Sequence, residues 1–240
     1  MLAGAIDPSF FQDRTKRTGC VADNGTFCWT WARDNFSDRY AHPFWQHVHL
    51  TVTAVSIGFV IAFALALAAH RSRWLVGPIV GVTGILYTLP SLAVFFLLQP
   101  LTGRGFLTAE IALVSYTLLI IFRNVVAGLD NVPEEARDAA RGIGYTDRQL
   151  LWRVELPLAL PEIMAGLRIA AVTTVGLATL AFFAGAGGLG AQIADPGLRS
   201  FKTNVLIAGS LCVGLAIAFD GGLLVVQRLL TPWSRARRVG

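Results

Sequence analysis

Long apolar runs alternate with short polar connections along most of the chain. Each run has about the length of a bilayer crossing, which is roughly 20 residues in a helix. The runs lie near residues 48–69, 77–99, 107–127, 162–184 and 204–230. This pattern predicts an all-α integral membrane protein with about five transmembrane helices. We expect an extracytoplasmic or interfacial N-terminal tail at 1–44, a transmembrane domain at 45–232 and a basic cytoplasmic tail at 233–240.

The composition supports a membrane location. Hydrophobic residues make up 54% of the chain and charged residues only 15%, against about 25% charged residues in soluble domains. A soluble protein with a fully buried helical core is the alternative, but several such runs would leave it too little polar surface. We therefore expect membrane lipid as a partner. The basic residues flank apolar runs and form no aromatic–basic motif, so no nucleic-acid partner is expected.

The distribution of basic residues predicts the orientation. The connections 70–76 and 128–157 and the end 228–240 would share one side, and they hold ten basic residues. These are Arg71, Arg73, Arg137, Arg141, Arg148, Arg153, Arg228, Arg235, Arg237 and Arg238. The opposite connections hold three, namely Arg104, Arg199 and Lys202. By the positive-inside rule, the N-terminus lies outside and the C-terminus in the cytoplasm.

Proline and glycine modify two of the expected helices. Pro90 lies inside the second apolar run, where it removes a backbone hydrogen bond and should kink or break the helix. The stretch GAGGLG at 185–190 contains a G-x-G pattern. A dinucleotide site would also need a preceding strand and a following acidic residue, which are absent here. We expect a flexible or tightly packed re-entrant backbone at this stretch instead.

The segment 128–157 between the third and fourth runs is unusually rich in charge, and its first half predicts a short helix. Asn131 has the spacing of an N-cap, and Pro133 suits the first turn. Gly142 and Gly144 should end this helix.

The second half of the segment predicts another short helix. Thr146 and Gln149 have the spacing of a capping box at its start. Pro157 should end the helix. Two capped helices on the cytoplasmic side form a compact projection that could dock into the groove of a partner.

The same segment resembles a known motif. The stretch DAARGIGYTDRQLLWRVELP at 138–157 has the spacing of the EAA loop in permease subunits of bacterial ABC importers, E-A-A-x3-G-x9-I-x-L-P. Asp138 replaces the first Glu, Val154 replaces Ile, and both keep the chemical type. The stretches at 155–168, 185–190 and 88–98 resemble importers of the osmoprotectants glycine betaine, choline and carnitine. The resemblance covers about 45–232, whereas residues 1–44 match nothing that we can place.

This resemblance implies the type I ABC importer fold and a multi-pass location in the bacterial inner membrane. It implies that the chain is not catalytic alone and works with ABC ATPase subunits, which bind ATP and Mg. A second permease subunit and an extracytoplasmic solute-binding protein are the other implied partners. The chain has no G-x-x-x-x-G-K-[ST] phosphate loop and carries no cofactor of its own.

The resemblance also implies which residues dock the ATPase. They are Glu135, Asp138, Ala139, Ala140, Arg141, Gly144, Arg148, Leu151 and Pro157. Gly144 would allow a sharp turn between the two helices, and the alternative role is an ordinary helix cap. Asp138 and Arg141 could contact the ATPase or simply form a solvated face.

A second set of residues are candidates for the solute pathway. They are Tyr87, Pro90, Phe95, Tyr116, Phe182 and Asp220. Aromatic rings, also including Phe96 and Phe183, could bind a quaternary ammonium by cation–π contacts, although packing is their more common use. Asp220 lies inside the fifth run, where a charge is costly. It could pair with Arg168 or Arg123, or contribute to solute passage.

Cysteine and histidine add two further expectations. Cys20 and Cys28 could form a disulfide if the tail is outside the cell, and two free thiols are the alternative; Cys212 is a packing residue. His47 and His49 are expected to anchor the helix at the membrane interface, and Glu110 is expected to lie in the interface rather than in a site. No metal site is expected, because no third ligand is evident.

Three other functions are weighed against the osmoprotectant importer. An importer of methionine or phosphonate would carry a similar loop. An ATP-independent secondary transporter or channel would have no reason for a docking projection. A membrane enzyme would need a catalytic arrangement such as Ser–His, Cys–His or H-E-x-x-H, and none is found in or beside the spans.

Overall fold

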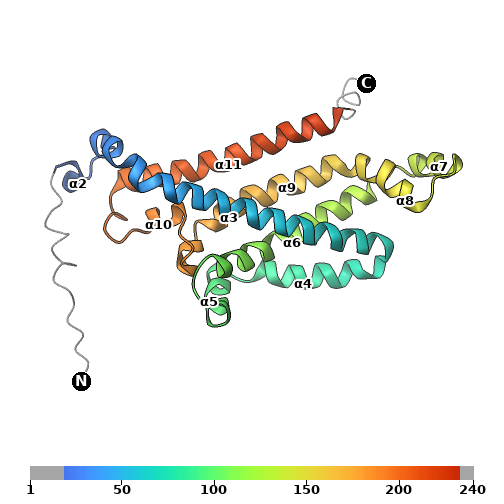
Figure 1. Cartoon of the computed structure of the whole chain (residues 1–240), viewed down its shortest axis with the longest axis horizontal. Coiled ribbons are helices and arrows are strands. Elements are labelled where there is room, and N and C mark those ends of the chain that lie inside the picture. The colour runs from blue at the N-terminus through green and yellow to red at the C-terminus, as the bar shows by residue number, and fades with distance from the viewer. Residues whose placement is uncertain (1–18, 233–240) are drawn as a thin grey trace.

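The computed structural model describes residues 19–232, and every regular element in that range is helical. Its four longest helices are α3 (Trp29–Arg71), α6 (Phe106–Asp130), α9 (Leu156–Ala178) and α11 (Lys202–Leu230). They run along the long axis of the molecule, and the shorter helices lie at its ends and along one side (Figure 1). The fold is therefore the predicted all-α bundle. The expected cytoplasmic tail at 233–240 lies outside the described residues.

The second apolar run is broken at Pro90. The short helix η1 (Arg73–Leu75) leads into α4 (Val76–Thr88), and α5 (Ser91–Thr102) follows at an angle of 97°. Leu89 is extended, with ψ 136°, as is usual for a residue before proline. The predicted break is confirmed. Four described helices can cross a membrane by length and composition, or five if the bent pair counts as one span.

Helix α3 is longer than the first apolar run. It begins at Trp29 and continues through residues that the sequence assigned to a tail ending at 44. The polar residues in this part have partners on other elements: Tyr40 donates a hydrogen bond to Oδ1 of Asn204 at 2.6 Å, and Arg39 forms an ion pair with Asp195. The N-terminal part of α3 is therefore a folded arm against the start of α11.

Small residues let the long helices approach closely. A Cβ added to Gly58 on α3 would lie 1.8 Å from Oγ1 of Thr117 on α6. One added to Gly166 on α9 would lie 2.4 Å from the Cβ of Asn124 on α6. Close backbone approach at such residues is the usual way in which membrane helices gain packing contacts. Helix α6 thus lies at the centre, between α3 and α9.

The glycine-rich stretch is tightly packed. The fourth apolar run ends as a helix at Ala178, and η3 (Ala181–Ala184) and α10 (Leu189–Ile193) follow. Gly187 and Gly188 have φ of 77° and 82°, a region that favours glycine. A Cβ on Gly190 would lie 1.7 Å from the backbone oxygen of Thr179. Of the two expected alternatives, the packed backbone is the one found.

His47 corrects the expectation of interfacial anchoring, and Glu110 is buried as well. His47 is fully buried, with Nε2 2.9 Å from the carbonyl oxygen of Val175. Its Nδ1 accepts a hydrogen bond from the backbone N–H of Leu189 at 3.3 Å. Glu110 is also buried and accepts a hydrogen bond from the hydroxyl of Thr53. The anchoring expectation was wrong for His47, because α3 extends beyond the apolar run and the bundle encloses the side chain; the interfacial position of Glu110 stays a prediction. His49 stacks beside Phe106, with ring centroids 4.9 Å apart.

The two N-terminal cysteines form a disulfide, with Cα atoms 6.1 Å apart. Their loop contains helix α2 (Cys20–Asp23) and Asn24, which has φ 45°. The Asn24 side chain accepts a hydrogen bond from the N–H of Lys202 at 3.0 Å and donates one to the oxygen of Ser200 at 2.8 Å. The disulfide loop therefore caps the first residue of α11. Cys212 is buried and free.

Candidate functional site

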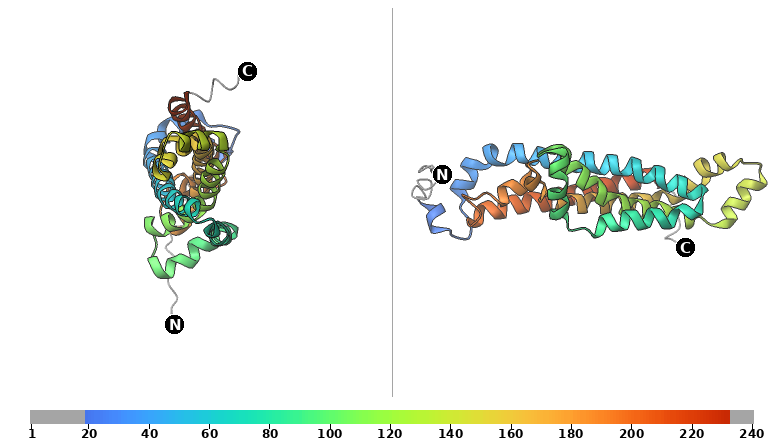
Figure 2. Two further views of the ribbon diagram at one scale, coloured as in Figure 1. Left: turned by 90° about the vertical axis from the view of Figure 1, so that its right-hand side faces the viewer. Right: turned by 90° about the horizontal axis from the view of Figure 1, so that it is seen from below.

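The charged segment forms a projection at one tip of the molecule. Helices α7 (Glu134–Gly142) and α8 (Asp147–Leu150) extend beyond the long helices, at the end where α11 finishes (Figure 1). Helix α2 lies at the opposite end (Figure 2). We call residues 134–152 the tip segment. The two short helices predicted from the sequence are both present.

The turn between α7 and α8 requires Gly144. This residue has φ 88°, and a Cβ there would meet nothing within 4 Å. The N–H of Gly144 bonds to the oxygen of Arg141, and that of Tyr145 bonds to the oxygen of Ala140. These bonds satisfy the last carbonyl groups of α7. The glycine is thus both a helix cap and the turn between the helices.

The capping of the two helices follows the sequence only in part. Thr146 and Gln149 form the predicted capping box at the start of α8. Asn131, by contrast, does not cap α7; it ends α6, and its N–H bonds to the oxygen of Ala127 at 2.9 Å. That prediction was wrong because Pro133 takes the N-cap position and makes no side-chain cap.

The predicted end of the second helix at Pro157 was also wrong. From Asp147 to Ala178 the chain stays helical, through a π-helical turn, η2, at Leu151–Glu155. Pro157 lies in the first turn of α9, where its missing N–H is tolerated. The wider π-helical turn just before it lets the helix pass the proline ring without ending.

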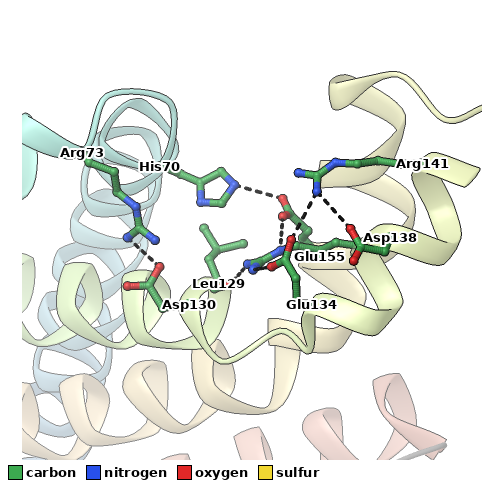
Figure 3. A network of polar contacts seen from close by, with 9 residues as sticks. His70, Arg73, Leu129, Asp130, Glu134, Asp138, Arg141 and Glu155 are labelled. Carbon is green, nitrogen blue, oxygen red and sulfur yellow. Dashed lines mark hydrogen bonds and ion pairs between the residues drawn. The ribbon is translucent and has the colours of Figure 1, made fainter.

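A network of charged groups fixes the tip segment to the bundle (Figure 3). Its centre is Glu155, whose side chain is 5% exposed. Oε1 accepts a hydrogen bond from Nε of Arg137 at 2.8 Å, and Oε2 accepts one from Nε2 of His70 at 2.9 Å. Arg137 also donates to the oxygen of Leu129 at 2.7 Å. The network therefore joins α7 to the ends of α3, α6 and the helix that leads into α9.

Sequence reasoning missed this network. The signal that could have found it is Glu155 itself, a carboxylate at the edge of an apolar run in WRVELPLAL. A buried carboxylate needs a partner, and Arg137 is the basic residue of α7 nearest to the bundle. A second ion pair, Arg73–Asp130 at 2.7 Å, lies at the same end of the bundle.

The outer surface of α7 carries exposed ion pairs. Arg141 lies 3.2 Å from Glu134 and 3.5 Å from Asp138. The hydrogen bond from Arg137 lowers the pKa of Glu134 below its ordinary value, so that contact is lost only as the pH falls through the lowered pKa. Such exposed pairs contribute little stability. They leave a charged surface free to contact a partner.

Most of the nine residues expected to dock an ATPase are on the surface of the tip segment or beside it. Ala140 is buried, and Leu151 and Pro157 are half-buried. The exposed members are Glu135, Asp138, Ala139, Arg141, Gly144 and Arg148. Sequence reasoning did not select two large apolar side chains of this region, Ile143 and Trp152, which are 73% and 54% exposed. Exposed apolar groups among charges are typical of a protein interface.

The residues expected to line a solute pathway do not form one site. Tyr87 and Tyr116 pack edge to face, with centroids 6.1 Å apart, and the Tyr116 hydroxyl donates to the oxygen of Leu89 at 2.6 Å. These two therefore lie at the Pro90 break. Phe95 is fully buried in the core, and Phe182 packs on Phe183.

Asp220 pairs with Arg168, one of the two partners considered. Nε of Arg168 donates to Oδ1 and Nη2 donates to Oδ2, both at 2.8 Å. The pair lines a pocket of about 620 Å³ between α9 and α11. Arg123 is exposed on α6 and is not part of this pocket.

A helical bundle with membrane-length apolar helices and a charged two-helix tip defines a membrane component of a transport system. The chain belongs to the family described as "Binding-protein-dependent transport system inner membrane component", which matches residues 54–235. The bundle from the apolar part of α3 onwards is thus the family domain. The disulfide loop and the N-terminal part of α3 precede the matched residues.

Curated relatives match over most of their length. The osmoprotectant import permease protein OsmW of Salmonella typhimurium is 40% identical over 193 residues, which cover 78% of this chain and 89% of that protein. The choline transport system permease protein OpuBB of Bacillus subtilis is 39% identical over 189 residues, which cover 78% of this chain and 87% of that protein. Both relatives are named as permease proteins of transport systems.

Solved structures show the same fold. An inward-facing structure of the MetNI methionine ABC transporter has a chain with TM-score 0.69 and 23% identity, covering 80% of this chain and 95% of that chain. A crystal structure of an amino acid ABC transporter with histidines gives TM-score 0.66 and 18% identity, covering 83% and 95%. The chain therefore has the predicted type I ABC importer fold.

Proposed function

We propose that this chain is the permease subunit of an ATP-driven importer that moves quaternary-ammonium osmoprotectants, such as glycine betaine, choline and carnitine, into the cytoplasm. The permease role follows from the family. The solute class is supported by relatives at 37–40% identity whose names specify choline, carnitine or osmoprotectants.

The tip segment is the proposed docking site for an ATPase on a separate chain, which would bind ATP and Mg. The observation that carries this proposal is the combination of an exposed surface with a rigid base. Ile143 and Trp152 offer apolar contact area, and the charges around them can set the register of a partner. Arg137 and Glu155 tie that surface to the membrane helices.

The other partners and the orientation complete the proposal. Two ATPase subunits would need two permease subunits, so the chain works as a homodimer or close heterodimer. A solute-binding protein delivers the solute at the end that carries the disulfide loop. That end lies outside the cell and the tip segment lies in the cytoplasm, as the excess of arginine at the tip end supports.

Transport then follows from movement of the tip segment. When the ATPase pair closes on nucleotide, it displaces α7 and α8. The contacts of Glu155 with Arg137 and His70 transmit this displacement to α9 and α3. The long helices tilt against one another and open the pathway to the outside, and hydrolysis reverses the change.

The experiment is radiolabelled uptake in a bacterium that lacks its own osmoprotectant importers and expresses this chain with its cognate ATPase and binding protein. Uptake of glycine betaine, choline and carnitine, but not methionine, is the expected result. Uptake should stop when the ATPase is deleted or its phosphate-loop lysine is replaced. Uptake of methionine alone would contradict the solute class, and uptake that persists without the ATPase would contradict the ATP-driven mechanism.

A further inference from the structure

The pocket between α9 and α11 combines one ion pair with apolar walls. Arg168 and Asp220 lie inside the two membrane-length helices, with side chains 25% and 42% exposed. Ile169, Val172 and Ile217 line the same pocket and are 53%, 38% and 67% exposed. The volume of about 620 Å³ falls in the range of small-molecule sites, about 300–1,000 Å³.

An exposed ion pair at this position is unfavourable against lipid. Charged side chains within membrane helices almost always face the protein interior or a water-filled cavity. Arg168 and Asp220 are not enclosed by this chain, because α11 leaves most of its membrane-length stretch uncovered: only 11% of that stretch is buried. Under the proposed function this face meets either a second permease subunit or water, and we take the pocket to face water in at least one state of the transport cycle.

We infer that this pocket is a transient binding site for the solutes of the proposed class that carry both a carboxylate and a methylated ammonium group, namely glycine betaine and carnitine; choline has no carboxylate and would make only the contacts of its ammonium group. Arg168 uses Nε and Nη2 for Asp220, and its Nη1 makes no hydrogen bond within the described residues. Nη1 can donate to the solute carboxylate. The methyl groups then pack on Ile169, Val172 and Ile217, with the positive charge facing Asp220.

The direct pairing of Arg168 with Asp220 suits a site that must release its ligand. An unpaired arginine in a low-dielectric pocket would hold a carboxylate strongly, whereas passage requires binding that is weak enough to leave. The Arg168–Asp220 pair has no net charge, and neither has the zwitterion. The pair therefore attracts both charged groups of the solute, but no net charge on the protein holds the solute in place. This inference rests on the proposed function and adds a recognition step within the membrane.

Cysteine accessibility tests the site independently of transport. Val172→Cys is introduced with Cys212→Ala, and the whole complex in proteoliposomes is treated with a charged, membrane-impermeant thiol reagent on both faces, with and without ATP. We expect Val172→Cys to react in at least one state and to be protected by millimolar glycine betaine. The matched control is Val125→Cys on α6, which is 0% exposed in the core of the bundle and should not react in any state.

The site would be overturned if Val172→Cys reacts in no state, or if it reacts but glycine betaine does not protect it. Either result leaves the proposed function intact if the unlabelled complex still imports glycine betaine. Loss of import by the unsubstituted complex would instead contradict the proposed function.

A double neutral variant separates solute contact from simple pairing. A purely structural ion pair between partly exposed side chains contributes little, so Arg168→Gln with Asp220→Asn would then transport normally. If the pair contacts the solute, uptake falls about tenfold or more, as expected for a lost hydrogen bond to a charged group, while ATPase co-purification is unchanged. The control is Arg73→Gln with Asp130→Asn, an exposed pair outside the pocket. Wild-type uptake by the pocket variant would overturn the inference.

Discussion

Arg137 donates from Nε to Oε1 of Glu155 at 2.8 Å, across 18 residues of sequence. The two side chains are 15% and 5% exposed. A charge this buried is costly without its partner, so the contact fixes the orientation of α7 relative to the helix that enters the membrane. In the importer account, this is the contact through which movement of the tip segment reaches the bundle.

Glu155→Gln should weaken that contact and destabilise the permease. Gln presents an NH2 group to donors that need an acceptor, so we expect the free energy of unfolding to fall by about 1–3 kcal/mol and uptake to fall with ATPase binding retained. Glu134→Gln, on a side chain that is 60% exposed, should change stability by less than about 0.5 kcal/mol. Thermal unfolding in detergent and uptake measure both, and equal behaviour of the two variants would contradict the role of Glu155.

Substitution of Gly144 should disturb the turn without a steric clash. Its φ of 88° disfavours any residue with a Cβ, at a cost of about 1–2 kcal/mol. We expect Gly144→Asp to abolish transport and lower co-purification of the ATPase, with membrane insertion intact, whereas Gly142→Ala should be tolerated. Wild-type uptake by Gly144→Asp would show that the turn is not needed.

Gly190→Ala should be among the most damaging single substitutions. Its Cβ would lie 1.7 Å from the backbone oxygen of Thr179, and no side-chain movement relieves a clash with backbone. We expect a loss of about 3 kcal/mol or more in folding stability, seen as a lower yield of monodisperse protein. Gly209→Ala, where a Cβ meets nothing within 4 Å, is the control. Similar yields for the two variants would refute this packing.

Reduction of the Cys20–Cys28 disulfide should loosen the cap on α11. The bond closes a short loop, and its loss costs about 2.5 kcal/mol in the chain-entropy account. We expect Cys20→Ser with Cys28→Ser to unfold at a lower temperature than wild type, and reducing agent to destabilise wild type but not the variant. Asn24→Ala should reproduce part of the effect, because Asn24 holds the first residue of α11. An unchanged unfolding temperature in all of these cases would mean that the disulfide loop does not stabilise the start of α11.

The apolar pattern predicted most of the bundle because lipid forces backbone hydrogen bonds into helices. The break at Pro90, the glycine turn at Gly144 and the Thr146 capping box were likewise predicted, since each depends on residues close in sequence. Capping by Asn131 and the end at Pro157 were predicted wrongly, because a neighbouring proline and a π-helical turn overrode the local signals.

Contacts between residues that are distant along the chain could not be predicted from the sequence. Nothing near His47 in the sequence indicates that Val175 and Leu189 enclose it. The same holds for the network of Glu155, which joins helices that are distant along the chain. Asp220 was an exception, because a charge inside an apolar run requires a partner and few basic residues were within reach.

The most direct test of the account is site-specific photo-crosslinking of the tip segment in the membrane. A photoreactive amino acid is placed at Ile143 and, as control, at Trp74, which is equally exposed at 73% but lies outside the tip segment. In a transport-active complex we predict a crosslink to the ATPase subunit from position 143 and none from position 74. A transport-active complex without any ATPase crosslink from position 143 would contradict the account.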